Sequence, residues 1–218
     1  MNDETPIPLN AKRWPRHSDN WYVEEFWCDK RLFDVEEIPS GLVYDPHCGM
    51  GRVLDAAAER GYFAFGSDIK DRSPKHPLTI SSVFDLDFST LGGPTIVSNP
   101  PYSRATGHRI IKHLVSELEH GSVEKVCLLL PATFLWADGR VEWFEQHKPE
   151  RVWIIAPRPS MPPGEMIELG VPPEGGKTDY AWYVWTVENL MLGADPACRW
   201  LRRDGFNNRL FTNQEERA

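Results

Sequence analysis

Long apolar runs, paired cysteines and an excess of positive charge are all missing from this 218-residue chain. No stretch approaches 18 uncharged apolar residues and the amino terminus is polar and acidic, so we expect neither a transmembrane helix nor a secretory signal. The four cysteines are scattered and form no C-x-x-C pair, which argues against a structural zinc site and a disulfide framework. A reducing, cytoplasmic setting fits these absences, and we expect neither a metal nor a membrane partner.

The formal net charge of -8 is not that of a tight, non-specific nucleic-acid binder. The charge is nevertheless uneven, because basic segments with interleaved aromatics lie at residues 12–17 and 199–203. Each of these segments is either a solvated tail or a contact for phosphate groups. The length and the 41% hydrophobic content fit one well-buried domain.

Apolar runs alternate with helical patterns through most of the chain. The apolar runs predict seven strands, at residues 42–44, 62–66, 78–84, 95–98, 126–130, 152–156 and 180–186. The helical patterns lie at residues 21–33, 52–60, 105–120 and 141–147. This alternation predicts an α/β fold with a mostly parallel sheet, helices on both faces and ligands at the carboxyl ends of the strands.

Three segments lie outside this pattern. Residues 1–20 contain prolines that interrupt any helix, so we expect an extended arm before a single domain at 21–218. Residues 158–178 hold many prolines and glycines and predict a long excursion between the last two strands. Such loops in compact domains are usually functional or disordered. From about residue 187 we expect a peripheral helix or tail.

The first strand ends in the stretch Val43-Tyr44-Asp45-Pro46-His47-Cys48-Gly49-Met50-Gly51, which has the features of a ligand-binding turn. Gly49 and Gly51 allow a sharp turn and a close approach of the backbone to a ligand, and the helix that follows presents free N–H groups. Asp68, at the end of the second strand, is placed to bind ribose hydroxyls. The alternative is a plain strand-to-helix turn.

Two details separate a dinucleotide from an amino-acid-like cofactor at this turn. The full G-x-G-x-x-G pattern of a pyrophosphate site would need glycine where Leu54 stands. Asp45 would repel a pyrophosphate, but its carboxylate suits the α-ammonium group of S-adenosylmethionine. After the third strand, either Asp85 or Asp87 is placed to meet the adenine of the cofactor, and we favour Asp85.

A second motif, Asn99-Pro100-Pro101-Tyr102, follows the fourth strand and predicts chemistry. The lone pair of an exocyclic base amine is delocalised into the ring, so methylation needs acceptors that aim the nitrogen at a methyl donor. The side-chain oxygen of Asn99 and the carbonyl of Pro100 can accept the two amine protons, and the adjacent prolines stiffen the loop. Tyr102 offers a ring on which an extruded base can stack.

Together the two motifs resemble those of class I S-adenosylmethionine-dependent methyltransferases, in particular small N6-adenine DNA methyltransferases of phages and prophages. The resemblance covers roughly residues 20–186 and implies a Rossmann-like sheet of seven strands with the last one antiparallel. It implies that Tyr22, Asp45, Pro46, Gly49, Gly51, Asp68, Ile69, Asp85 and Asn99 hold the cofactor and that Asn99, Pro100, Pro101 and Tyr102 act on the target base. It also implies that the segment from Arg158 to Trp182 contacts the target strand.

These features predict a bacteriophage-type enzyme that methylates a flipped adenine of DNA at N6 by direct in-line attack, as a monomer or homodimer. Nearly the same loop would serve an RNA adenine, a cytosine N4 or a protein glutamine amide. The acidic net charge keeps the glutamine alternative open, whereas the short segment before the first strand favours nucleic acid. A non-catalytic module that keeps the cofactor fold is a further alternative, and the role of His47 is open.

Overall fold

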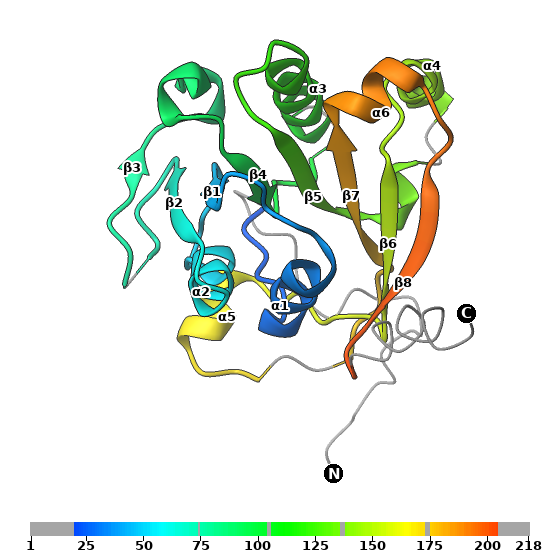
Figure 1. Cartoon of the computed structure of the whole chain (residues 1–218). Coiled ribbons are helices and arrows are strands. Elements are labelled where there is room, and N and C mark those ends of the chain that lie inside the picture. The colour runs from blue at the N-terminus through cyan, green and yellow to red at the C-terminus, as the bar shows by residue number, and fades with distance from the viewer. Residues whose placement is uncertain (1–19, 74, 104–105, 136–137, 173–174, 205–218) are drawn as a thin grey trace, which may run out of the picture.

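The computed structural model describes residues 20–73, 75–103, 106–135, 138–172 and 175–204. These residues form an eight-stranded sheet with the order β3-β2-β1-β4-β5-β7-β6-β8 (Figure 1). The strands are β1 (Leu42–Asp45), β2 (Phe63–Asp68), β3 (Thr79–Ile80), β4 (Thr95–Ser98), β5 (Lys125–Pro131), β6 (Arg151–Ala156), β7 (Tyr180–Thr186) and β8 (Ala197–Arg202). Only β7 runs antiparallel to its neighbours in this sheet, which confirms the predicted α/β class and the antiparallel seventh strand.

Two predictions about strands were wrong. The region from residue 187 contains the expected helix, α6 (Val187–Leu192), but it then adds an eighth strand, which was not predicted and pairs in parallel with β6. It carries the basic segment 199–203, and only Leu201 in it is buried, so no apolar run marks it in the sequence. The third strand has two residues instead of seven, because the chain turns at Ser82 into a short 3-10 helix, Val83–Asp85, whose first turn that serine caps.

The helices lie on both faces of the sheet (Figure 1). They are α1 (Phe26–Val35), α2 (Arg52–Glu59), α3 (Thr106–Glu119), α4 (Asp138–Gln146), α5 (Gly164–Glu168) and α6 (Val187–Leu192). The first helix begins five residues later than the predicted start at residue 21. None of the helices in the described part of the chain is long and apolar enough to cross a membrane. The expected arm, with the basic segment 12–17, lies outside the described residues except for Asn20.

Alternate residues of each central strand face opposite layers of the core, as the pleat requires. In β5, Val126 and Leu128 pack with α3, whereas Cys127 and Leu129 pack with the layer of α1 and α2. The same alternation in β7 places three aromatic side chains, Tyr183, Trp182 and Trp185, at 1% exposure or less. Burial on both faces explains why these strands are continuous apolar runs in the sequence.

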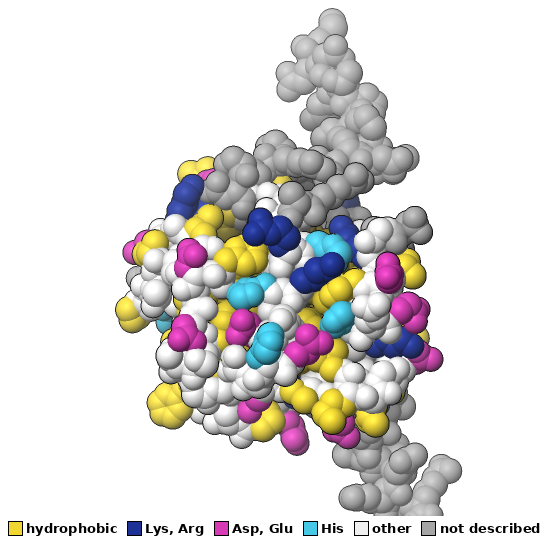
Figure 2. All heavy atoms as spheres, turned by 90° about the horizontal axis from the view of Figure 1, so that it is seen from above, with side chains coloured by type: hydrophobic (Ala, Val, Ile, Leu, Met, Phe, Trp, Pro, Cys, Tyr) yellow, Lys and Arg dark blue, Asp and Glu magenta, His cyan; other side chains and the backbone are white. Residues whose placement is uncertain are grey.

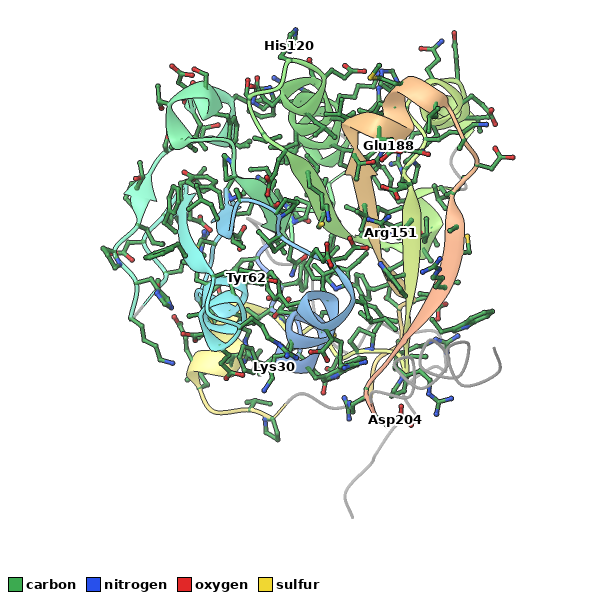
Figure 3. All side chains as sticks on the ribbon, in the orientation of Figure 1. Lys30, Tyr62, His120, Arg151, Glu188 and Asp204 are labelled. Carbon is green, nitrogen blue, oxygen red and sulfur yellow. The ribbon has the colours of Figure 1, made fainter. Side chains whose placement is uncertain are left out.

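The parallel strands end at one edge of the sheet. Asp204, which follows β8, lies at the lower edge of Figure 3, and His120, which follows α3, lies at the upper edge. The parallel strands therefore run downward in this view, and their carboxyl ends meet the Pro/Gly-rich segment 158–178 below the sheet.

A buried carboxylate joins the opposite edge of the sheet to α1. Glu36, the residue after α1, is 3% exposed and accepts hydrogen bonds from Arg151 (2.6 and 2.8 Å), Trp153 Nε1 (2.7 Å) and Lys125 Nζ (3.2 Å). Burial opposes ionisation, but these donors hold the pKa of Glu36 below its usual value. Lys125 and Arg151 begin β5 and β6, so one side chain ties a helix to two strands.

Replacing Glu36 by glutamine should lower the free energy of unfolding by about 3 kcal/mol, because the buried Lys125 loses its counter-charge and the half-buried Arg151 keeps only Glu150. Urea denaturation at pH 7 measures this loss. Since the folded-state pKa is lowered, the difference from wild type should be complete above the usual pKa of 4.5 and should shrink as the pH falls below it. The control is Glu59→Gln, which removes an exposed ion pair with Lys30 and should change little. Equal stability of the two variants would contradict this role of Glu36.

Candidate active site

A pocket opens where β1, β2 and β4 end. Its walls are built from residues 21–24 before α1, which we call the strap, and from the turn after β1 and the end of β2. The turn before η1 (Val83–Asp85), the loop after β4 and the start of α3 complete them. The lining residues are Asn20, Trp21, Tyr22, Val23, Glu24, Asp45, His47, Cys48, Gly49, Met50, Arg52, Asp68, Ile69, Arg72, Ser82, Val83, Phe84, Asn99, Pro101, Thr106 and Ile110. The two sequence motifs therefore share one pocket.

The turn after β1 depends on its two glycines. Gly51 has φ +83° and caps α2 in the left-handed conformation, and Gly49 has φ +50°. A side chain would be strained at either position. The amide of Gly49 donates to Asp68 Oδ2 (2.9 Å), so the turn is bound directly to the end of β2. Gly49 lines the pocket, whereas Gly51 shapes the turn from outside it.

Asp45, Ser98 and His47 form a buried hydrogen-bonded chain at the pocket floor. Ser98 Oγ donates to Asp45 Oδ1 (2.7 Å), so the same hydroxyl must accept from His47 Nδ1–H (3.0 Å). This tautomer leaves His47 Nε2 as an acceptor, and among the described residues that buried atom has no partner. Burial lowers the pKa of His47 to about 3, so the ring is neutral.

Asp45 is 2% exposed and carries no ion pair in the described part of the chain. Burial raises its pKa to about 8, against hydrogen bonds from Ser98 and the His47 amide that favour the carboxylate. The negative charges of Glu24 and Asp68 act in the same direction as burial. The pocket thus holds a carboxyl group that a cationic ligand would ionise.

Asp68 is held more tightly than the sequence suggests. Besides the Gly49 amide, it accepts from the Lys70 amide (3.1 Å) and from Arg72 Nη1 (2.6 Å). The guanidinium of Arg72 lies over the ring of Trp21, 4.9 Å from its centroid. These contacts connect the end of β2 with the strap, and contact between Asp68 and a ribose stays a prediction.

The Asn-Pro-Pro-Tyr loop faces the strap. Asn99 Nδ2 donates to the carbonyl of Tyr22 (3.0 Å) and to Glu24 Oε2, and the hydroxyl of Tyr102 donates to Asn99 Oδ1. The ring of Tyr102 packs 5.7 Å from that of Tyr180, and its hydroxyl also contacts Met161 Sδ (3.8 Å). Burial raises the pKa of Tyr102 well above its usual value, so the hydroxyl keeps its proton.

The loop passes directly into α3. Ser103 accepts from the amides of Thr106 (3.1 Å, at Oγ) and Gly107 (2.9 Å, at its carbonyl). A Cβ on Gly107 would lie 2.9 Å from the Pro101 carbonyl oxygen, so the glycine allows the helix to approach the loop. The position of the Asn-Pro-Pro-Tyr loop is therefore fixed from both of its ends.

The structure brings together most of the predicted site residues but not all. Tyr22, Asp45, Gly49, Asp68, Ile69, Asn99 and Pro101 line the pocket, and Tyr102 bonds to Asn99. Pro46, Gly51 and Pro100 support the loops from outside the lining. Asp85 is exposed and outside the lining, and Asp87 accepts from the amide (3.1 Å) and hydroxyl of Ser89. The wall that these acids were expected to form consists of Ser82, Val83 and Phe84.

Sequence reasoning missed Trp21 and Glu24 on the strap and Arg52 and Arg72 near the turns. Of these four residues, only Trp21 is matched by a distinctive residue elsewhere in the sequence, the glycine at position 164. A Cβ on Gly164 would lie 2.2 Å from its ring, so glycine is required where the Pro/Gly-rich segment passes the strap. Such a pairing of distant residues cannot be read from local pattern.

Gly66 in β2 is another position where the site depends on a missing side chain. An added Cβ would lie 2.5 Å from the backbone oxygen of Asp45 and 3.1 Å from Cys48 Cβ. We expect Gly66→Ala to force β2 away from the turn and to lower the free energy of unfolding by about 1–3 kcal/mol in urea. Gly139→Ala in α4, where an added Cβ has no neighbour within 4 Å, is the control and should hold or raise stability. A Gly66→Ala variant with the wild-type free energy of unfolding would contradict this tight contact.

Comparisons with known proteins concern the fold. No family model and no curated protein matches the chain in sequence. Among solved structures it is similar to one assigned as the modification subunit of a type I restriction enzyme from Vibrio vulnificus YJ016, with a TM-score of 0.52 and 12% identity over 92% of this chain and 54% of that one. The chain thus spans about half the length of that subunit.

Looser likenesses include a TehB-like SAM-dependent methyltransferase from Corynebacterium glutamicum (TM-score 0.41, 15% identity, 72% of this chain and 86% of that one). Another is the magnesium protoporphyrin IX methyltransferase from Synechocystis PCC 6803, with bound SAM (TM-score 0.40, 14% identity, 66% and 68%). The chain has a Rossmann-like α/β fold of the methyltransferase type.

Proposed function

We propose that this protein transfers a methyl group from S-adenosyl-L-methionine to the N6 amine of adenine in DNA, by in-line attack of a flipped base. The observation that carries the proposal is that Asn99, from the Asn-Pro-Pro-Tyr motif, lines the same pocket as Asp45, Gly49 and Asp68 from the ligand-binding turn and the end of β2. One cavity can therefore hold a methyl donor and present acceptors for an amine.

The lining of the pocket suits the charge of this cofactor. Glu24, Asp45 and Asp68 place three carboxyl groups around a space that must accept an ammonium and a sulfonium. Gly49 leaves room beside Trp21, since an added Cβ would lie 3.2 Å from that indole nitrogen. When bound, the cofactor supplies an electrophilic methyl group.

Asn99 and Pro100 are the groups that hold the target amine in this proposal. The Asn99 Oδ1 and the Pro100 carbonyl accept its two protons, which turns the nitrogen lone pair toward the methyl carbon. The N–C bond forms as the C–S bond breaks, and one amine proton passes to water. The amine takes the place of the Tyr102 hydroxyl at Asn99 Oδ1, so the Tyr102 side chain moves when a base enters.

A basic surface beside the loop supports a polyanionic substrate in spite of the acidic net charge. Arg109 lies over the ring of Phe84 (4.8 Å), which lines the pocket, and Lys112 and Arg140 lie over Trp143 (5.9 Å) and Phe134 (3.9 Å). Figure 2 views the molecule from above, on the face opposite the ends of β1, β2 and β4, and there Lys, Arg and His side chains gather in the upper middle while most acids lie below them and at the rim. Cations on aromatic rings suit phosphates and stacked bases.

Transfer of labelled methyl from the cofactor to unmethylated duplex DNA tests the proposal. Digestion to nucleosides should give N6-methyladenine, and Asn99→Ala should lose at least about 100-fold in rate, as removal of a preorganised polar group does. Tyr102→Phe keeps the ring and removes the competing hydroxyl, so it should stay active, whereas Tyr102→Ala should not. Cofactor affinity, measured by calorimetry, should be similar in both Tyr102 variants and wild type.

Parallel reactions with RNA, cytosine-only duplexes and glutamine-containing proteins decide among the substrates. If labelled methyl enters one of these molecules and not adenine-containing DNA, that molecule replaces DNA adenine as the proposed substrate. Cofactor binding without transfer to any of them would favour a non-catalytic module. Failure to bind the cofactor would contradict the proposal as a whole.

Cofactor binding should also release a proton at Asp45. Its pKa of about 8 means that the free protein carries this proton at pH 7, and a bound ammonium favours the carboxylate. Calorimetry in two buffers of different ionisation enthalpy should show release approaching one proton at pH 7 and little at pH 9. His47, with a pKa of about 3, contributes none in this range. Asp45→Asn should abolish the release; an unchanged release in that variant would contradict the assignment.

A further inference from the structure

We propose that Glu24 is a positioning residue that fixes the orientation of the Asn99 amide and so keeps its oxygen turned toward the target amine. The inference rests on the proposed function. It starts from the strap, residues 21–24, which the sequence does not mark as part of the catalytic site. Glu24 is 7% exposed and lines the pocket beside Asn99.

The strap is held rigidly by the segment 161–164. The Val23 amide donates to the Pro162 carbonyl (2.9 Å), the Gly164 amide donates to the Trp21 carbonyl (3.2 Å), and Tyr22 forms a bridge with Pro163. Residues 160–164 are buried in these contacts. The backbone on both sides of Glu24 is therefore fixed.

Both protons of the Asn99 amide nitrogen are used by this strap. One is accepted by the Tyr22 carbonyl (3.0 Å) and the other by Glu24 Oε2. If the amide were rotated by half a turn, its oxygen would face two acceptors and its nitrogen would face the substrate. An amide in that orientation would present donors to a target amine that itself needs acceptors. The strap therefore decides which end of Asn99 meets the base.

The charge of Glu24 adds to this effect. A hydrogen bond to a carboxylate is stronger than one to a neutral oxygen, and it polarises the amide so that Oδ1 accepts more strongly. Next to Glu24 lies Asp29, which is fully buried. Burial, followed by the charge of the nearby Glu24, raises the pKa of Asp29.

Exchanging the carboxylate of Glu24 and the amide of Asn99 between the two positions tests the inference. At saturating cofactor, Glu24→Gln should lower kcat about tenfold with the KM for DNA nearly unchanged, because an oriented charge-assisted bond is lost. Asn99→Asp should lose about 100-fold or more, since it sets two carboxylates against each other. The double variant combines Glu24→Gln with Asn99→Asp. In it the side-chain amide at position 24 can donate to one carboxylate oxygen at position 99. The other carboxylate oxygen then stays free to accept from the target amine. The double variant should therefore recover at least about tenfold over Asn99→Asp.

Glu25, the residue directly after the strap, provides a matched control. Its carboxylate accepts from the Ser160 amide (3.0 Å) and Arg203 (2.7 Å) and does not contact Asn99. Glu25→Gln should keep the wild-type kcat. A Glu24→Gln variant that folds, binds cofactor and matches wild type in kcat would overturn the proposal, as would a double variant no faster than Asn99→Asp.

A second measurement separates this inference from the proposed reaction. The side-chain NH₂ resonances of Asn99 can be assigned in a ¹H–¹⁵N spectrum by their loss in Asn99→Asp. We expect them to exchange slowly with solvent in wild type, to shift and exchange faster in Glu24→Gln, and to stay unchanged in Glu25→Gln. This result would support the contact even if no methyl transfer were found, and resonances unaffected by Glu24→Gln would overturn it.

Discussion

The hydrogen bond from Ser98 to Asp45 is the contact on which the candidate site depends. The two residues are 53 positions apart in the chain, but β1 and β4 are parallel neighbours, so their ends lie side by side. Ser98 directly precedes Asn99, and Asp45 directly precedes the ligand-binding turn. A fully buried hydroxyl needs a partner, and this one bonds with both Asp45 and His47. The two loops are thus held in one register by a single side chain.

The Pro/Gly-rich segment contributes to the same site as a support. Its first part, through Gly164, packs under the strap instead of extending into solvent. Proline lacks an amide proton, so this part cannot form a regular ladder with the strap. The Pro162 carbonyl and the Gly164 amide are the groups that bond to it. The strap, the Asn-Pro-Pro-Tyr loop and this segment therefore pack together around Asn99, and the contact of residues 158–182 with a target strand stays a prediction.

Much of the fold could be predicted because buried parallel strands are visible as apolar runs. The fourth and seventh strands have the predicted bounds, and the other central strands differ by one or two residues. The exceptions have physical causes. β8 is an edge strand with one buried side chain, so its composition resembles a tail. The third predicted run is interrupted by Ser82, which accepts from the Phe84 amide and begins a 3-10 turn that brings Phe84 to the pocket.

The sequence by itself determined the central strands, the main helices between them and the two loops that meet at the sheet edge, because the pattern of apolar residues and the glycine and proline positions are local properties. Only the tertiary structure decided which side chains surround those loops. Glu24 reaches Asn99 across 75 positions, and Gly164 leaves space for Trp21. Contacts of this kind depend on how distant segments pack, and packing leaves no periodic signal in the chain.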